Sequence, residues 1–350
     1  MPKICFKASN HIVQFHSPFK KGELETHSLE IRQDPLTGYQ SVLNEAFRGK
    51  IAFAFPQTDY DYLHQRMADT MGQCFMCEGK WRLASPSYPR ELLAQGRLEK
   101  GQSALFPNLF PLAPYHAVVM VGEKHGRTLD DFSPALLFDA LSISLEFIKR
   151  CFEVDPKTEY FTINANFMPP AGSSIMHPHL QIIGSPLPSS HLRVLLENSL
   201  AYHRENGSCY FTDLVETERQ SGQRWLGEIA HSGWFTAFSP LGVNEVNAVW
   251  PNSSNFLQWE DSDVQTLAEG LSRTLAAYHG LKFSTFNFSC FSGPLGKDLP
   301  EFRSFLRLIN RQNMHPHYRT DDFYLQKLLK DEIIVYPPEQ LASLIRENFR

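Results

Sequence analysis

The chain has 350 residues, of which 42% are hydrophobic and 20% are charged, and its formal net charge is −5. This length can bury one large core or two medium ones, so we expect two domains or a duplicated one. The negative balance and the absence of a Lys or Arg run argue against nucleic-acid partners. Residues 1–15 lack the apolar core of a signal peptide, and no stretch reaches the roughly 18 apolar residues of a membrane span. We therefore expect a cytoplasmic protein that does not enter a membrane.

The first half of the chain shows a readable order of elements. Residues up to about 60 mix apolar runs with turn signals, which indicates strands and loops. A Pro-rich loop then leads into a β-prone run at about 116–121. Ser133 and Pro134 can begin a helix that continues to Cys151. Its apolar residues recur at helical spacing: Leu137, Leu141, Leu145 and Ile148. Apolar and polar residues alternate at 161–166, which predicts a strand.

A similar order recurs in the second half, which indicates an internal repeat. A Pro-containing loop and strand are expected at 234–250, a helix after 261–263, a strand and loop at 284–296, and a strand at 304–309. The polar segment 189–233 is expected to connect the halves. We predict an α+β duplication of mostly antiparallel strands with one crossover helix in each half, divided into residues 1–188 and 189–350. The second copy lacks the histidines of the first, so only the first half is expected to carry the chemistry.

Six cysteines are too sparse in a chain of this length for a disulfide scaffold. Only Cys74 and Cys77 are paired by spacing, as a CxxC. This spacing suits half of a tetrahedral zinc site, which needs two further ligands. The alternative is a pair of buried thiols without a metal.

Two histidines flank a proline at His177-Pro178-His179, and Gln181 follows. In a strand, residues i, i+2 and i+4 share one face, so the two histidines and the glutamine would converge on one site. The alternative is a surface strand with two incidental histidines. The tripeptide occurs again at His315-Pro316-His317, but there it has neither the upstream Gly-Ser loop nor the downstream glutamine. We expect this second copy to lie on a surface turn.

The residues before the motif suit an anion. Gly172, Ser173 and Ser174 can supply N–H and hydroxyl groups around a phosphate, because glycine lets the main chain come close. Asn166, at the end of the preceding strand, can donate to the same anion. A neutral imidazole can attack phosphorus and carry a phosphoryl or nucleotidyl group, which splits one displacement into two. These residues together predict a site for phosphoryl or nucleotidyl transfer.

The motif resembles the active-site signature of the galactose-1-phosphate uridylyltransferases, a branch of the histidine triad superfamily. The matching residues, in order and spacing, are Asn166, Gly172, Ser174, His177-Pro178-His179 and Gln181. Segments 72–80, 123–133 and 337–349 also look similar to parts of that family. The resemblance implies two tandem histidine-triad-like repeats.

The resemblance also implies roles for single residues. His179 would be the nucleophile that becomes nucleotidylated, Gln181 would bind the transferred phosphoryl group, and Ser174 would contact phosphate oxygens. His125 and His177 would complete a closed Cys₂His₂ zinc site, in which the metal steadies the backbone that presents His179.

Three further residues are weaker candidates for substrate contacts. The resemblance suggests Asn108 and Phe110 for the nucleoside pocket, although Phe110 can equally be a core aromatic. Arg48 would meet the diphosphate, or else be a solvated surface arginine.

The sequence departs from the family pattern at three places. The second metal site of the family uses an HxH that aligns with residues 307–311, where histidines are absent. No second metal of that kind is therefore expected. Leu109 stands where the uridylyltransferases have an acidic residue after the nucleotide-contacting asparagine, which puts the preference for uridine in doubt. Residues 322–336 offer no confident counterparts of the sugar-phosphate contacts.

Three functions remain open at this point. The first is exchange of a nucleoside monophosphate between a nucleoside diphosphate sugar and a sugar 1-phosphate, through nucleotidyl-His179. The second is a phosphorylase that uses inorganic phosphate to split a nucleoside diphosphate sugar or a dinucleoside polyphosphate. The third is a non-catalytic nucleotide-binding zinc protein. The resemblance implies a homodimer in addition.

Overall fold

A ten-stranded sheet forms the centre of the protein. The computed structural model describes residues 4–48 and 55–350. From one edge to the other, the strands are β4 (Leu98–Lys100), β5 (Ser103–Pro107), β6 (Tyr115–Met120), β8 (His179–Ser185), β7 (Tyr160–Phe167), β12 (Phe286–Phe291), β13 (Phe305–Asn310), β11 (Val246–Val249), β10 (Ser232–Thr236) and β9 (Trp225–Ile229). All neighbouring strands are antiparallel. The predicted α+β class with mostly antiparallel strands is confirmed.

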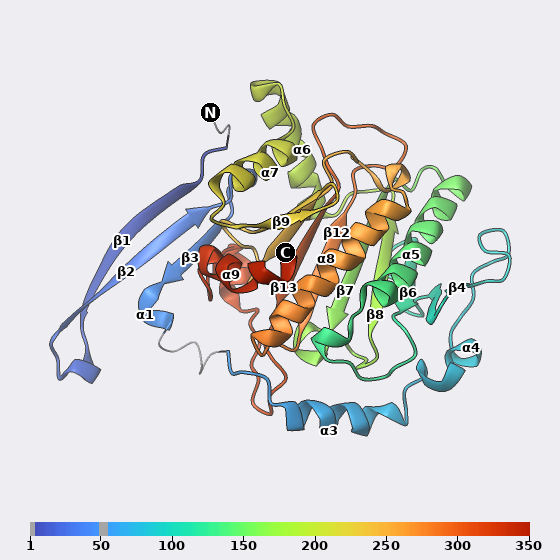
Figure 1. Ribbon diagram of the computed structural model, residues 1–350, viewed down its shortest axis with the longest axis horizontal. Coiled ribbons are helices and arrows are strands. Elements are labelled where there is room, and N and C mark those ends of the chain that lie inside the picture. Colours follow the sequence, from blue (N-terminus) through green and yellow to red (C-terminus); the bar gives the residue numbers. More distant parts are fainter. Residues whose placement is uncertain (1–3, 49–54) are drawn as a thin grey trace.

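From either edge of the sheet to its middle, the strands follow the same chain order, since β4-β5-β6-β8-β7 corresponds to β9-β10-β11-β13-β12. In the first half, α5 (Pro134–Val154) lies between β6 and β7, and in the second half α8 (Asp261–Gly280) lies between β11 and β12. The two helices contact each other and cover one face of the sheet (Figure 1). Both helices lie where the sequence predicts them, as do the strands expected near 116–121, 161–166 and 304–309.

The helix α5 forms for the reasons that its sequence suggests. The side chain of Ser133 caps the first turn by accepting a backbone N–H, and Pro134 occupies a position where no N–H is needed. Its apolar stripe is buried and includes Leu137, Leu141 and Ile148. Burial of this stripe against the sheet stabilises the helix more than its intrinsic propensity does.

The strands at the centre of the sheet have one apolar and one polar face. In β7, Phe161, Ile163 and Ala165 are at most 3% exposed and belong to the main core, which α5 and α8 share. The alternate residues Asn164 and Asn166 face the other way and are partly exposed. The same alternation recurs in β12. The face of the sheet that lies opposite the two helices therefore carries the polar side chains.

The segment 189–233 contains regular structure, whereas its composition suggested a connection. It holds α6 (Ser190–Asn206), α7 (Tyr210–Ser221), β9 and the start of β10. Each helix buries only a narrow stripe, with Leu192 and Leu195 in α6 and Phe211 and Val215 in α7. Amphipathic helices of this kind are polar in overall composition, which explains why the segment resembles a linker in sequence.

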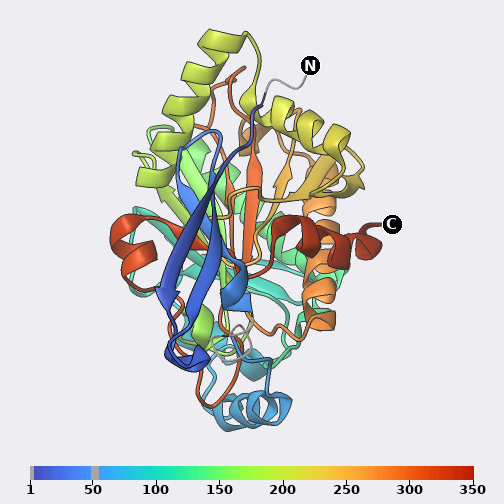
Figure 2. The same cartoon turned by 90° about the vertical axis from the view of Figure 1, so that its left-hand side faces the viewer.

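The N-terminal strands form a second sheet of four strands in the order β1-β2-β3-β14. These are β1 (Lys7–His16), β2 (Leu24–Gln33), β3 (Gln40–Asn44) and the parallel β14 (Glu332–Ile333). The hairpin of β1 and β2 projects from the body of the molecule in Figure 1, and Figure 2 shows it from its outer side. The prediction of strands and loops for this segment is confirmed where the structure describes it.

The remaining α-helices in the described part of the chain are short: α1 (Glu45–Arg48), α3 (Tyr60–Met71), α4 (Trp81–Ala84) and α9 (Pro338–Ile345). Within residues 4–48 and 55–350, no helix combines the length and apolarity that crossing a bilayer requires.

Candidate metal centre and active site

Two cysteines and two histidines meet in one buried cluster, the Cys₂His₂ cluster. Cys74 and Cys77 follow α3, His125 follows β6, and His177 lies two residues before the start of β8. Nδ1 of His125 lies 3.3 Å from Cys77 Sγ, and Nδ1 of His177 lies 3.5 Å from Cys77 Sγ and 3.7 Å from Cys74 Sγ. All four potential ligand atoms lie within 4.8 Å of one another. Zinc bonds of about 2.0–2.3 Å in tetrahedral geometry separate the ligand atoms by about 3.5 Å, so the cluster fits such an ion.

Hydrogen bonds fix the outer nitrogen of each histidine in the cluster. Nε2 of His177 lies 2.8 Å from the carbonyl oxygen of Gly122, and Nε2 of His125 lies 2.9 Å from the hydroxyl of Thr70. A carbonyl oxygen only accepts, so His177 donates from Nε2 and turns the lone pair of Nδ1 toward the cysteines. Metal-binding histidines in proteins are held in the same way.

Burial sets the protonation of the cluster. It lowers the pKa of His177 to about 4 and also lowers the pKa of His125, so both rings are neutral near pH 7. Burial and the neighbouring Cys74 raise the pKa of Cys77 to about 12. A divalent cation would reverse this preference and stabilise the thiolate. Two sulfur and two nitrogen donors form a ligand set that suits a tetrahedral ion such as zinc. This arrangement favours a metal site over the alternative of two buried thiols without a metal.

His179 is the first residue of β8, and it is only 8% exposed. Its Nδ1 lies 2.9 Å from the carbonyl oxygen of His177. Because that oxygen can only accept, Nδ1 carries the proton and Nε2 keeps a lone pair. Burial lowers the pKa of His179, which favours the neutral ring. His177 therefore joins two centres, since its side chain faces the Cys₂His₂ cluster and its carbonyl holds His179.

Two carboxamides lie beside His179 on the polar face of the sheet. Gln181 follows on the same strand, and the register of β7 and β8, which pairs Ala165 with Leu180, brings the next residues on each strand, Asn166 and His179, close together. Oε1 of Gln181 lies 2.8 Å from Nε2 of His116, and Oδ1 of Asn166 accepts a hydrogen bond of 2.7 Å from Nδ2 of Asn287. Neither NH₂ group has a hydrogen-bond partner among the described residues. Both amides therefore offer free donors to an anion.

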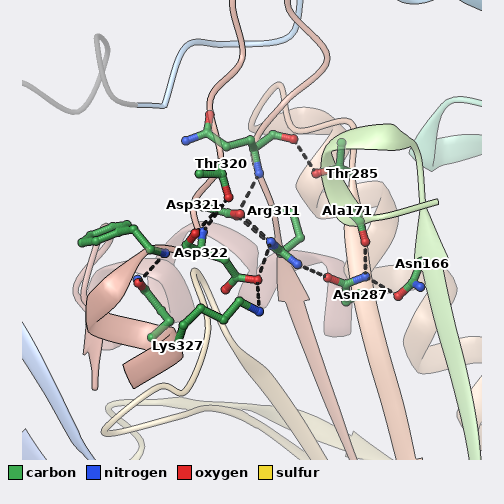
Figure 3. Close-up of polar contacts among 12 residues, drawn as sticks. Asn166, Ala171, Thr285, Asn287, Arg311, Thr320, Asp321, Asp322 and Lys327 are labelled. Carbon is green, nitrogen blue, oxygen red and sulfur yellow. Dashed lines mark hydrogen bonds and ion pairs between the residues drawn. The ribbon is translucent and has the colours of Figure 1, made fainter. Parts of the chain in front are cut away.

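Asn287 uses its whole amide to hold this arrangement (Figure 3). Its Nδ2 donates to Asn166 Oδ1 and, at 2.9 Å, to the carbonyl oxygen of Ala171. Its Oδ1 accepts a hydrogen bond of 2.8 Å from Nη1 of Arg311. Arg311 is fixed in turn by Asp321, whose carboxylate oxygens lie 2.7 Å from Nε and 2.5 Å from Nη2. Residues of the second half therefore orient Asn166 and the loop that follows β7.

The loop between β7 and β8 is tightly folded. Met168 has a φ of +72° and Gly172 a φ of +87°, a region that costs a residue other than glycine about 1–3 kcal/mol. The N–H of Gly172 and both donors of Ser173 bond to carbonyl oxygens within the loop. Ser174 is exposed and forms no hydrogen bond with a described residue. Its hydroxyl and N–H are therefore available to a ligand.

The other residues that the sequence singles out are Asn108, Phe110, Arg48 and the second His-Pro-His tripeptide. Asn108 follows β5, and its Oδ1 accepts a hydrogen bond of 2.9 Å from the N–H of Phe110. Phe110 is 78% exposed, which excludes a role in the core. Arg48 ends α1, and its side chain lies outside the described residues. The second tripeptide, His315-Pro316-His317, lies on the expected surface turn.

Three residues that hold the site were not predicted: His116, Asn287 and Arg311. The available signal for Asn287 was its place on the polar face of an alternating strand. His116 stands at the start of an apolar strand, where a polar residue needs a partner. Arg311 gives no signal in the sequence, because a single arginine after a strand is most often solvated.

No family model matches the sequence. An uncharacterised protein of Archaeoglobus fulgidus is 29% identical over 328 residues, which cover 93% of this chain and 94% of that protein. An ADP-glucose phosphorylase from Arabidopsis thaliana, solved with bound ADP-glucose, matches with a TM-score of 0.71 and 20% identity over 91% of this chain and 98% of its own. A GalT-like protein from Arabidopsis thaliana matches with a TM-score of 0.68 and 19% identity over 91% of this chain and 98% of its own. A uridylyltransferase mutant matches with a TM-score of 0.66 and 19% identity over 91% of this chain and 97% of its own. This chain therefore has the fold of the galactose-1-phosphate uridylyltransferase family.

Proposed function

We propose that this protein exchanges a nucleoside monophosphate between a nucleoside diphosphate sugar and a sugar 1-phosphate, with His179 as the covalent carrier. The observation that carries the proposal is the hydrogen bond from Nδ1 of His179 to the carbonyl oxygen of His177. It leaves a nucleophilic lone pair on Nε2. Gln181 and Asn166 add free donors on the same face of the sheet, and the loop between β7 and β8 adds those of Ser174. The fold neighbours, which include an ADP-glucose phosphorylase and a uridylyltransferase, support the same class of chemistry.

In the first step, Nε2 of His179 attacks the α-phosphorus of the donor. An N–P bond forms, the bond from phosphorus to the bridging oxygen breaks, and sugar 1-phosphate leaves with the electron pair. The ring becomes a cation that the His177 carbonyl stabilises through Nδ1–H. In the second step, a phosphate oxygen of the acceptor attacks the same phosphorus, and the N–P electron pair returns to Nε2. The amides of Gln181 and Asn166 would donate to the non-bridging oxygens, where charge accumulates in both transition states.

We also propose that the Cys₂His₂ cluster binds zinc through Cys74, Cys77, His125 and His177. Four protein ligands leave no open position, so the ion would supply rigidity to the loop that presents His179 rather than a reacting group. The halves 1–188 and 189–350 would each be a histidine-triad-like repeat, with nucleotide chemistry in the first. We propose a homodimer as the working state.

A phosphorylase is the second candidate, because one fold neighbour is an ADP-glucose phosphorylase. It shares the first step and differs only in the acceptor, which would be inorganic phosphate. Departures from the uridylyltransferase pattern at Leu109 and at residues 322–336 leave the base and the acceptor to experiment.

The test uses UDP-, ADP- and GDP-glucose labelled in the α-phosphate. We expect one of the three donors to leave an acid-labile label on the protein. A chase with a sugar 1-phosphate should release labelled nucleoside diphosphate sugar, whereas a chase with inorganic phosphate would release labelled nucleoside diphosphate from a phosphorylase. Nucleotide binding without any transfer of label would contradict both enzymatic proposals and leave the binding protein.

A change of Asn287 to Ala should lower kcat/KM by about 10–100-fold, as loss of an orienting residue commonly does. The substitution frees the amide of Asn166 to rotate and leaves the Ala171 carbonyl without its donor. Steady-state kinetics with the active donor measure the effect. Ser289→Ala is the matched control, because Ser289 lies on the same face of β12 but donates to Asn164. Its activity should stay within about threefold of the wild type, and equal losses in both variants would contradict the role of Asn287.

A further inference from the structure

His116 stands between the candidate phosphate site and the candidate nucleoside loop. It lies on β6 and is 3% exposed. Nε2 lies 2.8 Å from Oε1 of Gln181, and Nδ1 accepts a hydrogen bond of 3.1 Å from the backbone N–H of Leu112. The main chain of His116 also holds the loop, since its carbonyl oxygen accepts a hydrogen bond of 2.8 Å from the N–H of Asn108. One buried residue thus contacts both parts of the site.

The partner on Nδ1 decides which way the Gln181 amide points. A backbone N–H is always a donor, so Nδ1 of His116 has to be the unprotonated nitrogen of the neutral ring. Nε2 then carries the proton and can only donate. Gln181 must present its oxygen to this proton, and its NH₂ group is left for a ligand. Nδ2 of Asn108 also lies 3.2 Å from Nε2, but with the proton on Nε2 this is a contact between two donors and not a hydrogen bond. The hydrogen bond of Nε2 is therefore the 2.8 Å contact to Gln181.

The orientation of Gln181 matters because the two ends of a carboxamide have opposite effects on an anion. An NH₂ group stabilises the non-bridging oxygens of a phosphoryl group, whereas the amide oxygen repels them. A carboxamide without a fixed partner can adopt both orientations at small cost. A partner that only donates removes the unfavourable orientation before the substrate binds.

We propose that His116 is a positioning residue, which fixes the amide of Gln181 for phosphoryl transfer and anchors the loop of Asn108 and Phe110 through Leu112. This inference rests on the proposed function, since it assigns Gln181 to the transferred phosphoryl group. The two contacts use different nitrogens of one ring. They can therefore be separated by substitution.

Two variants of His116 test the two contacts. Asn places an oxygen near the position of Nδ1 and keeps an acceptor for Leu112, but it does not reach Gln181. We expect His116→Asn to lower kcat by about 10–100-fold with little change in KM. Gln reaches the position of Nε2 and can donate to Gln181, but it leaves Leu112 without its acceptor. We expect His116→Gln to keep kcat within about threefold and to raise KM for the donor. The same loss of kcat in both variants would overturn the proposal.

A double-mutant cycle distinguishes positioning from general damage. In a Gln181→Ala background, the change His116→Asn should cost no further kcat, because its target is already absent. Independent losses that multiply would contradict the inference.

The side-chain amide signals of Gln181 in a nitrogen–proton spectrum give a readout that needs no turnover. They should be sharp in the wild type and in His116→Gln, and broadened or shifted in His116→Asn. Unchanged signals in His116→Asn would overturn the inference even if no donor is found. Failure of the wild type to accept label, by contrast, would count against the proposed function alone.

Discussion

Replacing His179 with Asn is expected to lower kcat/KM by at least about 10⁴-fold, the largest effect at any residue of the site. The amide nitrogen of Asn can take the place of Nδ1 and keep the hydrogen bond to the His177 carbonyl. The substitution therefore removes Nε2 with little other change. The nearby histidines cannot replace it, because Nε2 of His116 donates to Gln181 and His177 faces the Cys₂His₂ cluster.

Steady-state rates and transfer of labelled nucleotide measure this effect. The wild type should take up label, and His179→Asn should bind the donor without taking up label. His191→Asn is the matched control, since His191 is a half-buried imidazole that lies on α6, away from the site. Its activity should stay within about threefold of the wild type. Activity of His179→Asn above about 1% of the wild type would argue against a covalent mechanism at this residue.

Loss of the metal is expected to have the second largest effect. Changing Cys74 and Cys77 to Ser should reduce bound zinc from one ion per chain to none. At free zinc about 1,000-fold above its dissociation constant, the lost binding lowers the free energy of unfolding by about 4 kcal/mol. The rate of label transfer should fall as well, because His177 then loses the ion that holds its ring, and its carbonyl orients His179.

Metal analysis, thermal unfolding and label transfer on one preparation check these three expectations. Cys290→Ala is the matched control, because Cys290 is fully buried but lies on β12 outside the cluster. It should lose some stability and keep its zinc. An unchanged zinc content in the double variant would contradict the metal site. Loss of zinc with an unchanged rate of labelling would show that the metal does not support His179.

The sequence predicts those parts of the fold in which a local pattern decides the structure. The helix over 134–154 follows from a cap and a single apolar stripe, and the strand over 160–167 follows from strict alternation. The grouping of Cys74 and Cys77 with His125 and His177 came from the family resemblance, because spacing alone identifies only the cysteine pair. The structure confirms that these four side chains meet.

The features that the sequence does not predict depend on contacts between residues that are far apart in the chain. His116 and Gln181 are 65 positions apart, and Asn166 and Asn287 are 121 apart, so only the register of the sheet brings each pair together. The helices within 189–233 were missed for a different reason. Their buried stripes are narrow, and composition averages them with the polar residues around them.

The proposed mechanism requires a transient bond between Nε2 of His179 and phosphorus. Its most direct test is to incubate the wild-type protein with the active nucleoside diphosphate sugar, without an acceptor, and to locate the adduct by mass spectrometry under conditions that preserve phosphoramidates. We expect one nucleoside monophosphate on His179, which an acceptor removes with formation of the second product. An adduct on another residue, or exchange between donor and acceptor with no covalent adduct at any time, would contradict it.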